Sequence, residues 1–186
     1  LAPARLHITQ HGKDIPAFWP KDRPIQPPVS RYVLSLETLT LAERLKRRGY
    51  ATGFFGKWHL SGDDRDREEG TGSAFWPEHQ GFDLNVGGCG YGGPPTYFDP
   101  YRIPAIKPRR TGEYLTDRLA DETIAFMRAH HNQPMFICLW TYNPHYPFEA
   151  PADLIPKYKG KEGPGLKNPV YAAQLEALAG MDARLL

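Results

Sequence analysis

The chain has 186 residues and a formal net charge of +2, with 40% hydrophobic and 24% charged residues. These values fit one globular domain and argue against a nucleic-acid partner, and no apolar run reaches the length of a membrane span. Two cysteines are too few for a disulfide framework.

Residues 1–37 are rich in proline and lack sustained hydrophobic periodicity, so no regular element is predicted there. His7 and His11 lie in this segment. Both could serve as ligands, but we interpret them as ordinary solvated or capped loop histidines.

A helix is predicted over residues 40–48. Thr40 and Glu43 have the spacing of a capping box, in which each side chain accepts a hydrogen bond from the other's backbone N–H. Basic residues fill the last turn, where they suit the helix dipole. Gly49 ends the helix, because glycine adopts the left-handed backbone at low cost.

A short buried strand is predicted over residues 51–55, an apolar and β-prone run. Lys57 and His59 follow at once, separated by Trp58. If the segment stays extended, the ammonium and the imidazole lie on the same side. Open α/β sheets bind ligands just past the carboxyl ends of their strands, so Lys57 and His59 are candidate site residues.

A glycine-rich loop covers residues 87–95. Its glycines formally spell G-x-G-x-x-G, but prolines follow where a dinucleotide-binding protein would open a helix, so that function is rejected. We expect this loop at the rim of a pocket. Tyr91, Tyr97 and Tyr101 could contact a substrate, but we interpret them as tyrosines packed in an ordinary loop.

A second helix is predicted over residues 112–131, where apolar residues recur at helical spacing. The next strand, residues 134–142, is continuously apolar, as in a parallel strand covered on both faces. His145 follows in a proline-rich turn, and Pro169 is predicted to start a last helix. The inner face of that helix is expected to comprise Ala172, Leu175, Leu178 and Ala179.

Lys57, His59 and His145 thus all follow buried strands. If these strands are parallel, both turns emerge at one edge of the sheet, and three nitrogen groups converge on one crevice. Such a crevice suits an anion, and its imidazoles can transfer protons near neutral pH.

Two stretches resemble the type I, formylglycine-dependent sulfatases. Residues 40–60 resemble the family's second signature, and His145 lies in a Pro-His-Tyr-Pro run like the family's Pro-His-x-Pro setting. The resemblance implies that Lys57 binds a sulfate oxygen and the formylglycine, and that His59 is the base that helps to expel sulfate. It further implies that His145 binds sulfate and is suited to protonate the leaving oxygen. Lys57 and His145 are therefore also expected to bind substrate.

The fold implied by the resemblance is α/β, part of an alkaline-phosphatase-like sheet with flanking helices, incomplete at both ends. Residues 1–186 would form the central portion of a sulfatase catalytic domain. No Cys/Ser-x-Pro-x-Arg motif occurs in the sequence. Asp63 and Asp64 sit in a hydrophilic run and do not match the position of the family's metal-binding Asp-Asp pair. No metal ligand is assigned, and the isolated chain is expected to be inactive.

Calcium and formylglycine are expected in the full-length protein. The expected substrate is a sulfated small molecule or glycan, and members of the family are often exported. Two other functions remain open at this point. One is a phosphate-ester or phosphonate hydrolase of the same superfamily, and the other is a non-catalytic module that binds anions or glycans.

Overall fold

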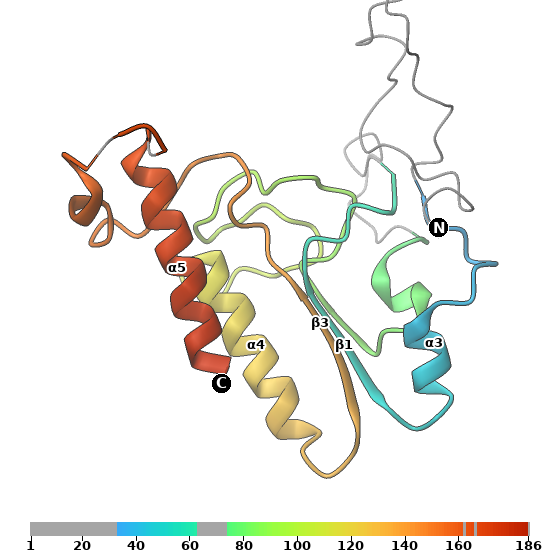
Figure 1. Ribbon diagram of the computed structural model, residues 1–186. Coiled ribbons are helices and arrows are strands. Elements are labelled where there is room, and N and C mark those ends of the chain that lie inside the picture. Colours follow the sequence, from blue (N-terminus) through green and yellow to red (C-terminus); the bar gives the residue numbers. More distant parts are fainter. Residues whose placement is uncertain (1–32, 63–73, 162, 166, 186) are drawn as a thin grey trace, which may run out of the picture.

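The computed structural model describes residues 33–62, 74–161, 163–165 and 167–185 (Figure 1). Its centre is a parallel sheet of order β2-β1-β3, formed by Ala51–Gly56 (β1), Leu84–Val86 (β2) and Met135–Trp140 (β3). The predicted α/β class is confirmed, as are the two predicted strands. The sequence analysis missed β2, because a strand of three residues leaves no readable pattern.

Helices cover both faces of this sheet. The helix α3 (Leu41–Lys46) lies on one side, and α4 (Leu115–Ala129) and α5 (Pro169–Leu185) lie on the other (Figure 1). Two short 3-10 helices, η2 (Pro77–Gln80) and η3 (Ile155–Tyr158), complete the described elements. The three predicted helices are confirmed, and none of the described helices is long and apolar enough to cross a membrane.

The side chains of β1 alternate between two cores. Ala51 and Phe55 belong to the core beneath α4, whereas Phe54 packs with Trp58 and Phe82 on the α3 side. All six residues of β1 are buried as a result. This central strand therefore provides a rigid support for the residues that follow it.

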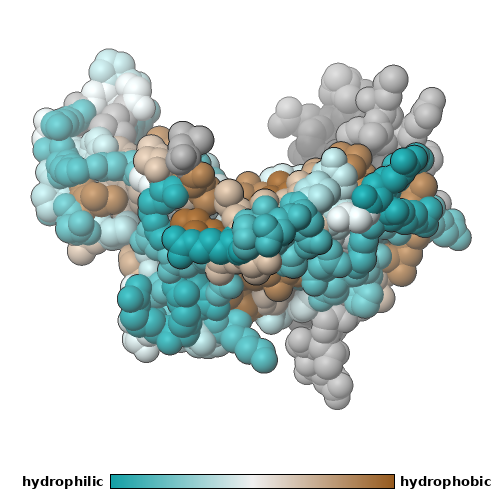
Figure 2. Space-filling model, turned by 90° about the horizontal axis from the view of Figure 1, so that it is seen from below, coloured by the Kyte–Doolittle hydropathy of each residue, from teal (hydrophilic) through white to brown (hydrophobic). Residues whose placement is uncertain are grey.

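β3 differs from its prediction. It was expected to be covered on both faces, but its residues are half-buried and Trp140 is 47% exposed. The reason is its place in the sheet, since no described strand pairs with its second edge. Hydrophobic surface is visible between hydrophilic stretches when the molecule is viewed from below (Figure 2).

The inner face of α5 is also rotated from its prediction. Leu175 is 40% exposed, although it was placed on the inner face. The buried residues are Ala172, Ala173, Gln174 and Met181. This rotation follows from the packing of α5 on α4 and from the contact that Gln174 makes with the turn after β3.

Candidate active site

The ends of β1 and β3 meet at one edge of the sheet. Gly56 pairs with Trp140, and the backbone N–H of Lys57 donates to the Trp140 carbonyl at 2.6 Å. Gly56 has a φ of 103°, and a Cβ there would lie 2.0 Å from that carbonyl oxygen, so only glycine fits. The polar turns after both strands thus start side by side, as predicted (Figure 1).

Lys57 carries a half-buried ammonium. Burial lowers its pKa from the ordinary value, because removal from water disfavours the charged form. Within the described residues, its side chain makes no hydrogen bond or ion pair. The negative charge of a bound anion would stabilise the ammonium and would therefore raise the pKa of Lys57 again.

His59 does not lie in an extended segment, as the prediction had assumed. Its φ is 58°, a left-handed conformation that is uncommon for residues other than glycine. Its backbone N–H donates to the Cys89 carbonyl at 2.9 Å, so the glycine-rich loop fixes this bend. Backbone strain of this kind, about 1–3 kcal/mol, is often found at functional sites.

His145 follows β3, and its imidazole is exposed. Its Nδ1 lies 2.7 Å from the Tyr146 carbonyl oxygen. A carbonyl can only accept, so we assign the proton to Nδ1. Nε2 is then the ring atom that remains for a substrate.

Two adjacent glycines bring the two imidazoles together. A Cβ on Gly92 would lie 2.6 Å from Cε1 of His59, and a Cβ on Gly93 would lie 2.4 Å from Nδ1 of His145. Because consecutive Cα atoms are about 3.8 Å apart, both rings flank one short stretch of loop. The backbone of Lys57 is held at the same edge of the sheet by its bond to the Trp140 carbonyl.

Buried neutral groups hold the His145 turn from beneath. The Tyr97 hydroxyl lies within hydrogen-bond distance of the carbonyls of Tyr142 and His145, at 2.8 and 2.9 Å. Gln174 of α5 donates to the same His145 carbonyl at 3.3 Å. Tyr97 was one of three tyrosines considered for substrate contact, and its fully buried side chain fits the other interpretation, ordinary packing.

Asn143 connects this turn to α4. Its Oδ1 accepts from the Thr116 hydroxyl at 2.6 Å, and its Nδ2 donates to the Gln174 carbonyl at 3.3 Å and the Tyr114 hydroxyl at 3.2 Å. Burial raises the pKa of Tyr97, and it raises that of Tyr114 to about 12. We call Tyr97, Thr116, Asn143 and Gln174 the His145 clamp.

Sequence reasoning missed three members of the clamp. Thr116 and Gln174 are polar residues on the buried faces of their helices, and this was the available signal. Asn143 stands one residue beyond the predicted strand, where polar groups often line a site.

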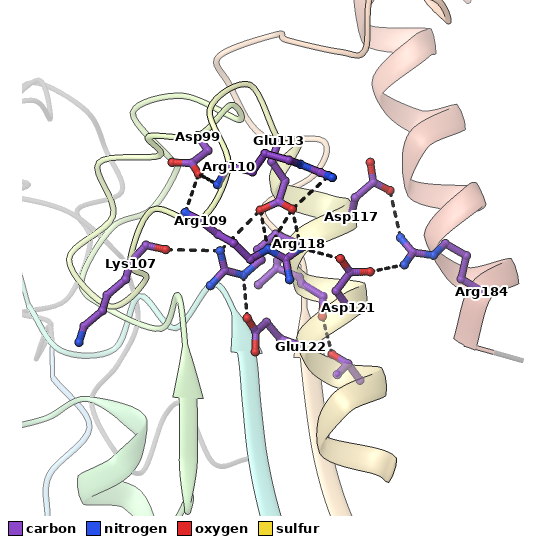
Figure 3. A network of polar contacts seen from close by, with 12 residues as sticks. Asp99, Lys107, Arg109, Arg110, Glu113, Asp117, Arg118, Asp121, Glu122 and Arg184 are labelled. Carbon is purple, nitrogen blue, oxygen red and sulfur yellow. Dashed lines mark hydrogen bonds and ion pairs between the residues drawn. The ribbon is translucent and has the colours of Figure 1, made fainter. Parts of the chain in front are cut away.

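Figure 3 shows a charged cluster around Glu113, just before α4. Glu113 is 3% exposed, and its carboxylate accepts from Arg109 at 2.5 Å and from the Tyr101 hydroxyl at 3.0 Å. Arg110 and Arg118 lie 3.3 and 3.5 Å away. We call these five residues the Glu113 cluster. Tyr101, another of the three tyrosines considered, is buried and packed as we interpreted it, while Tyr91 is half-buried against the core.

The Glu113 cluster supports the loop that carries Tyr97. Burial alone would raise the pKa of Glu113, but hydrogen bonds from Arg109 and Tyr101 outweigh it and lower the pKa. The Asp99 N–H donates to the Glu113 carbonyl at 3.0 Å, and the Leu115 N–H donates to the Tyr97 carbonyl at 2.8 Å. These bonds connect the cluster to the clamp.

Several predicted features lie elsewhere. His7, His11, Asp63 and Asp64 fall outside the described residues. Among the residues that the structure describes, no group of three or more His, Cys, Asp or Glu side chains could hold a metal ion. A surface cavity of about 380 Å³ is lined by Ile103, Ile106, Arg102 and three prolines, and none of the three candidate site residues lines it.

Comparison with protein families gives one match over most of the chain. A family model described as Sulfatase matches residues 24–185. Arylsulfatase A of Homo sapiens is 48% identical over 60 residues, and an arylsulfatase of Hemicentrotus pulcherrimus is 40% identical over 57 residues. These matches cover 32% and 31% of this chain, and 10% of each relative.

Solved structures share the fold. Ps i-CgsB in complex with k-i-k-neocarrahexaose has a TM-score of 0.61 and 23% identity, over 84% of this chain and 37% of that chain. The protein YidJ of Bacteroides fragilis has a TM-score of 0.60 and 20% identity, over 82% of this chain and 40% of that chain. The chain therefore spans well under half of these structures.

Proposed function

Because the chain belongs to the sulfatase family, we propose that the full-length protein hydrolyses sulfate monoesters at a site that contains Lys57, His59 and His145. One observation carries the proposal. The imidazoles of His59 and His145 flank Gly92 and Gly93, at the sheet edge where Lys57 has a half-buried ammonium.

Lys57 would bind a sulfate oxygen. A unit negative charge about 4 Å from the ammonium is attracted to it by roughly 4 kcal/mol at an effective dielectric constant of about 20. The lowered pKa of Lys57 supports this role. The ammonium is half-buried without a counter-charge among the described residues, so a bound anion would stabilise its charged form.

The two histidines would handle protons. With its proton on Nδ1 directed at Tyr146, His145 keeps Nε2 for the sulfate group or the leaving oxygen. Protonated Nε2 could donate to that oxygen as the ester bond breaks. His59, held by the Cys89 carbonyl, would act as the base that helps to expel sulfate.

We further propose that residues 1–186 form the central portion of the catalytic domain. The family resemblance implies a formylglycine nucleophile and a calcium ion, which would supply the attacking group and charge neutralisation. The described residues do not fit a calcium ion, because no cluster of ligands is present among them. The roles above are therefore restricted to this chain's own residues.

The proposed substrate class is a sulfated glycan or a sulfated small molecule. The structure of Ps i-CgsB with a neocarrahexaose supports the first, as a neighbour with the same fold that binds an oligosaccharide.

The test compares turnover of 4-nitrophenyl sulfate and 4-nitrophenyl phosphate by the full-length protein. We expect a preference for sulfate, and a loss of roughly 10²–10³ in kcat on substitution Lys57→Ala. Lys107→Ala is the matched control, because this lysine is exposed on another loop. A preference for phosphate would identify a phosphate-ester hydrolase, and sulfate binding without turnover would identify a binding module.

A further inference from the structure

Three aromatic rings form a continuous ladder beside the candidate site. Tyr146 and Phe148 have ring centroids 6.0 Å apart, and Phe148 and Tyr171 have centroids 5.4 Å apart. Tyr146 is 71% exposed and Phe148 is 44% exposed. We call these three residues the aromatic ladder. Contiguous exposed apolar rings commonly mark a binding surface.

The ladder begins one residue from His145. The Tyr146 carbonyl accepts from Nδ1 of His145, so the backbone of one residue orients the imidazole of the other. Tyr97 and Gln174 hold the His145 carbonyl from beneath. The position of the ladder relative to the imidazole is thus set by a buried framework.

The other end of the ladder rests on α5. Tyr171 lies in the first turn of this helix, and η3 packs against the same helix. The segment after η3 begins with exposed basic residues, and the Lys161 ammonium lies 5.8 Å from the ring centroid of Tyr158. Lys159 makes no ion pair with a described residue. Aromatic rings and exposed lysines therefore occur together here.

We propose that the aromatic ladder is a subsite for the sugar ring that carries the reacting sulfate, a role that rests on the proposed function. A pyranose presents an apolar C–H face for an aromatic ring and hydroxyl groups around its rim. The Tyr146 hydroxyl has no hydrogen-bond partner among the described residues, so it is available for such a rim hydroxyl. Lys159 and Lys161 would attract further sulfate groups on a longer glycan.

The test measures dissociation constants for the full-length protein. Its probes are inorganic sulfate and hexasaccharides of carrageenan, chondroitin sulfate and heparin, of which the tightest binder is used throughout. We expect Tyr146→Ala to weaken hexasaccharide binding about tenfold, as for the loss of one aromatic stacking contact, and to leave sulfate binding unchanged. Tyr146→Phe should retain most of the affinity. Tyr50→Ala is the matched control, since Tyr50 precedes β1 at the opposite edge of the sheet.

Other outcomes separate the two proposals. Unchanged hexasaccharide affinity in Tyr146→Ala, or no hexasaccharide binding by a protein that binds sulfate, would overturn the sugar subsite alone. A lower melting temperature with unchanged affinity would do the same, because it would show that other parts of the polypeptide cover the ladder. Failure of the unaltered protein to bind inorganic sulfate would contradict the proposed function itself.

Discussion

The His145 clamp and the Glu113 cluster hold neighbouring parts of the molecule by different physical means. The clamp consists of neutral groups, and its hydroxyl and amide groups bond carbonyls in a buried space. The cluster surrounds one buried carboxylate with three arginines (Figure 3), and a tyrosine hydroxyl donates to the same carboxylate. In the clamp, Oε1 of Gln174 is buried without a hydrogen-bond partner among the described residues. Of the two, only the cluster depends on charge.

This difference suggests that the cluster contributes mainly to the stability of the fold, and the clamp mainly to the position of the His145 turn. A buried ion pair is expensive to break, because the remaining partner keeps its charge without compensation. A neutral hydrogen bond contributes less, but it is directional and insensitive to salt. The backbone of His145 is thus held by neutral groups, and its imidazole is oriented by the Tyr146 carbonyl. The stronger, charged contacts of the Glu113 cluster do not touch His145, and they hold the loop that carries Tyr97.

The largest effect should follow from Glu113→Gln. This change keeps the shape but leaves Arg109, Arg110 and the buried Arg118 without their central counter-charge. We expect a loss of about 3–5 kcal/mol in the free energy of unfolding, measured by urea denaturation. Asp117→Asn is the control, because this carboxylate is about half exposed and should cost less than about 1 kcal/mol. Equal losses in the two variants would show that the Glu113 cluster stabilises the fold no more than an exposed ion pair does.

Acid should weaken the cluster before the clamp. The folded-state pKa of Glu113 is lowered, so its contribution is present above the unfolded carboxyl value, about 4.3, and is lost as pH falls through the folded value. Asp121, which pairs with Arg109 and Arg184, is lowered as well and adds to this loss. Stability curves from pH 7 downward should therefore fall less steeply in Glu113→Gln. An unchanged slope would contradict this assignment.

Alkali should act on the tyrosines of both regions. Burial raises the folded-state pKa of Tyr97, and that of Tyr114 rises to about 12. Their contribution is fully present below about pH 10, the unfolded value, and is lost as pH rises through the folded values. Tyr101 of the cluster is raised too, first by burial and then by Glu113. Unfolding of Tyr97→Phe and Tyr101→Phe should be measured at alkaline pH. The difference between the two variants would show how much of the lost unfolding free energy comes from each region.

Tyr97→Phe should have a smaller effect on stability and a clear one on the site. Without the hydroxyl, the Tyr142 and His145 carbonyls lose a donor, at a cost of about 1–3 kcal/mol. The His145 imidazole should become more mobile, which ¹⁵N relaxation of its ring nitrogens would detect. Tyr146→Phe, at an exposed ring, should change neither quantity. An unaltered ring signal in Tyr97→Phe would remove the positioning role.

Local patterns explain which parts of the fold could be read from the sequence. The capping box of Thr40 and Glu43 is formed, and Gly49 has the expected left-handed backbone, because both depend on neighbouring residues only. The bend at His59 could not be read, since the Cys89 carbonyl that fixes it comes from a loop some thirty residues later. The bonds of the Tyr97 hydroxyl could not be read for the same reason, because its partner carbonyls lie 45 and 48 residues away.

The candidate site divides in the same way. Residue types and strand ends placed Lys57, His59 and His145 at one edge of the sheet. What brings the two imidazoles together is steric, namely the lack of a Cβ on Gly92 and Gly93, and this depends on how a distant loop docks. The catalytic roles of the three residues remain predictions.

The smallest effect should come from Arg184→Ala, at the exposed end of the charged network. Arg184 of α5 pairs with Asp121 and lies 3.3 Å from Asp117, and its side chain is 39% exposed. Solvent screening limits such pairs to about 1 kcal/mol or less, and in about 1 M salt, where the Debye length is about 3 Å, the loss should vanish. Asp121 also contacts Arg109, which pairs with Glu113, so Arg184 could still be coupled to Glu113 through these two residues. A double-mutant cycle with Glu113→Gln decides the matter: additivity within about 0.5 kcal/mol means that the cluster ends at Arg109, and a larger coupling energy extends it to α5.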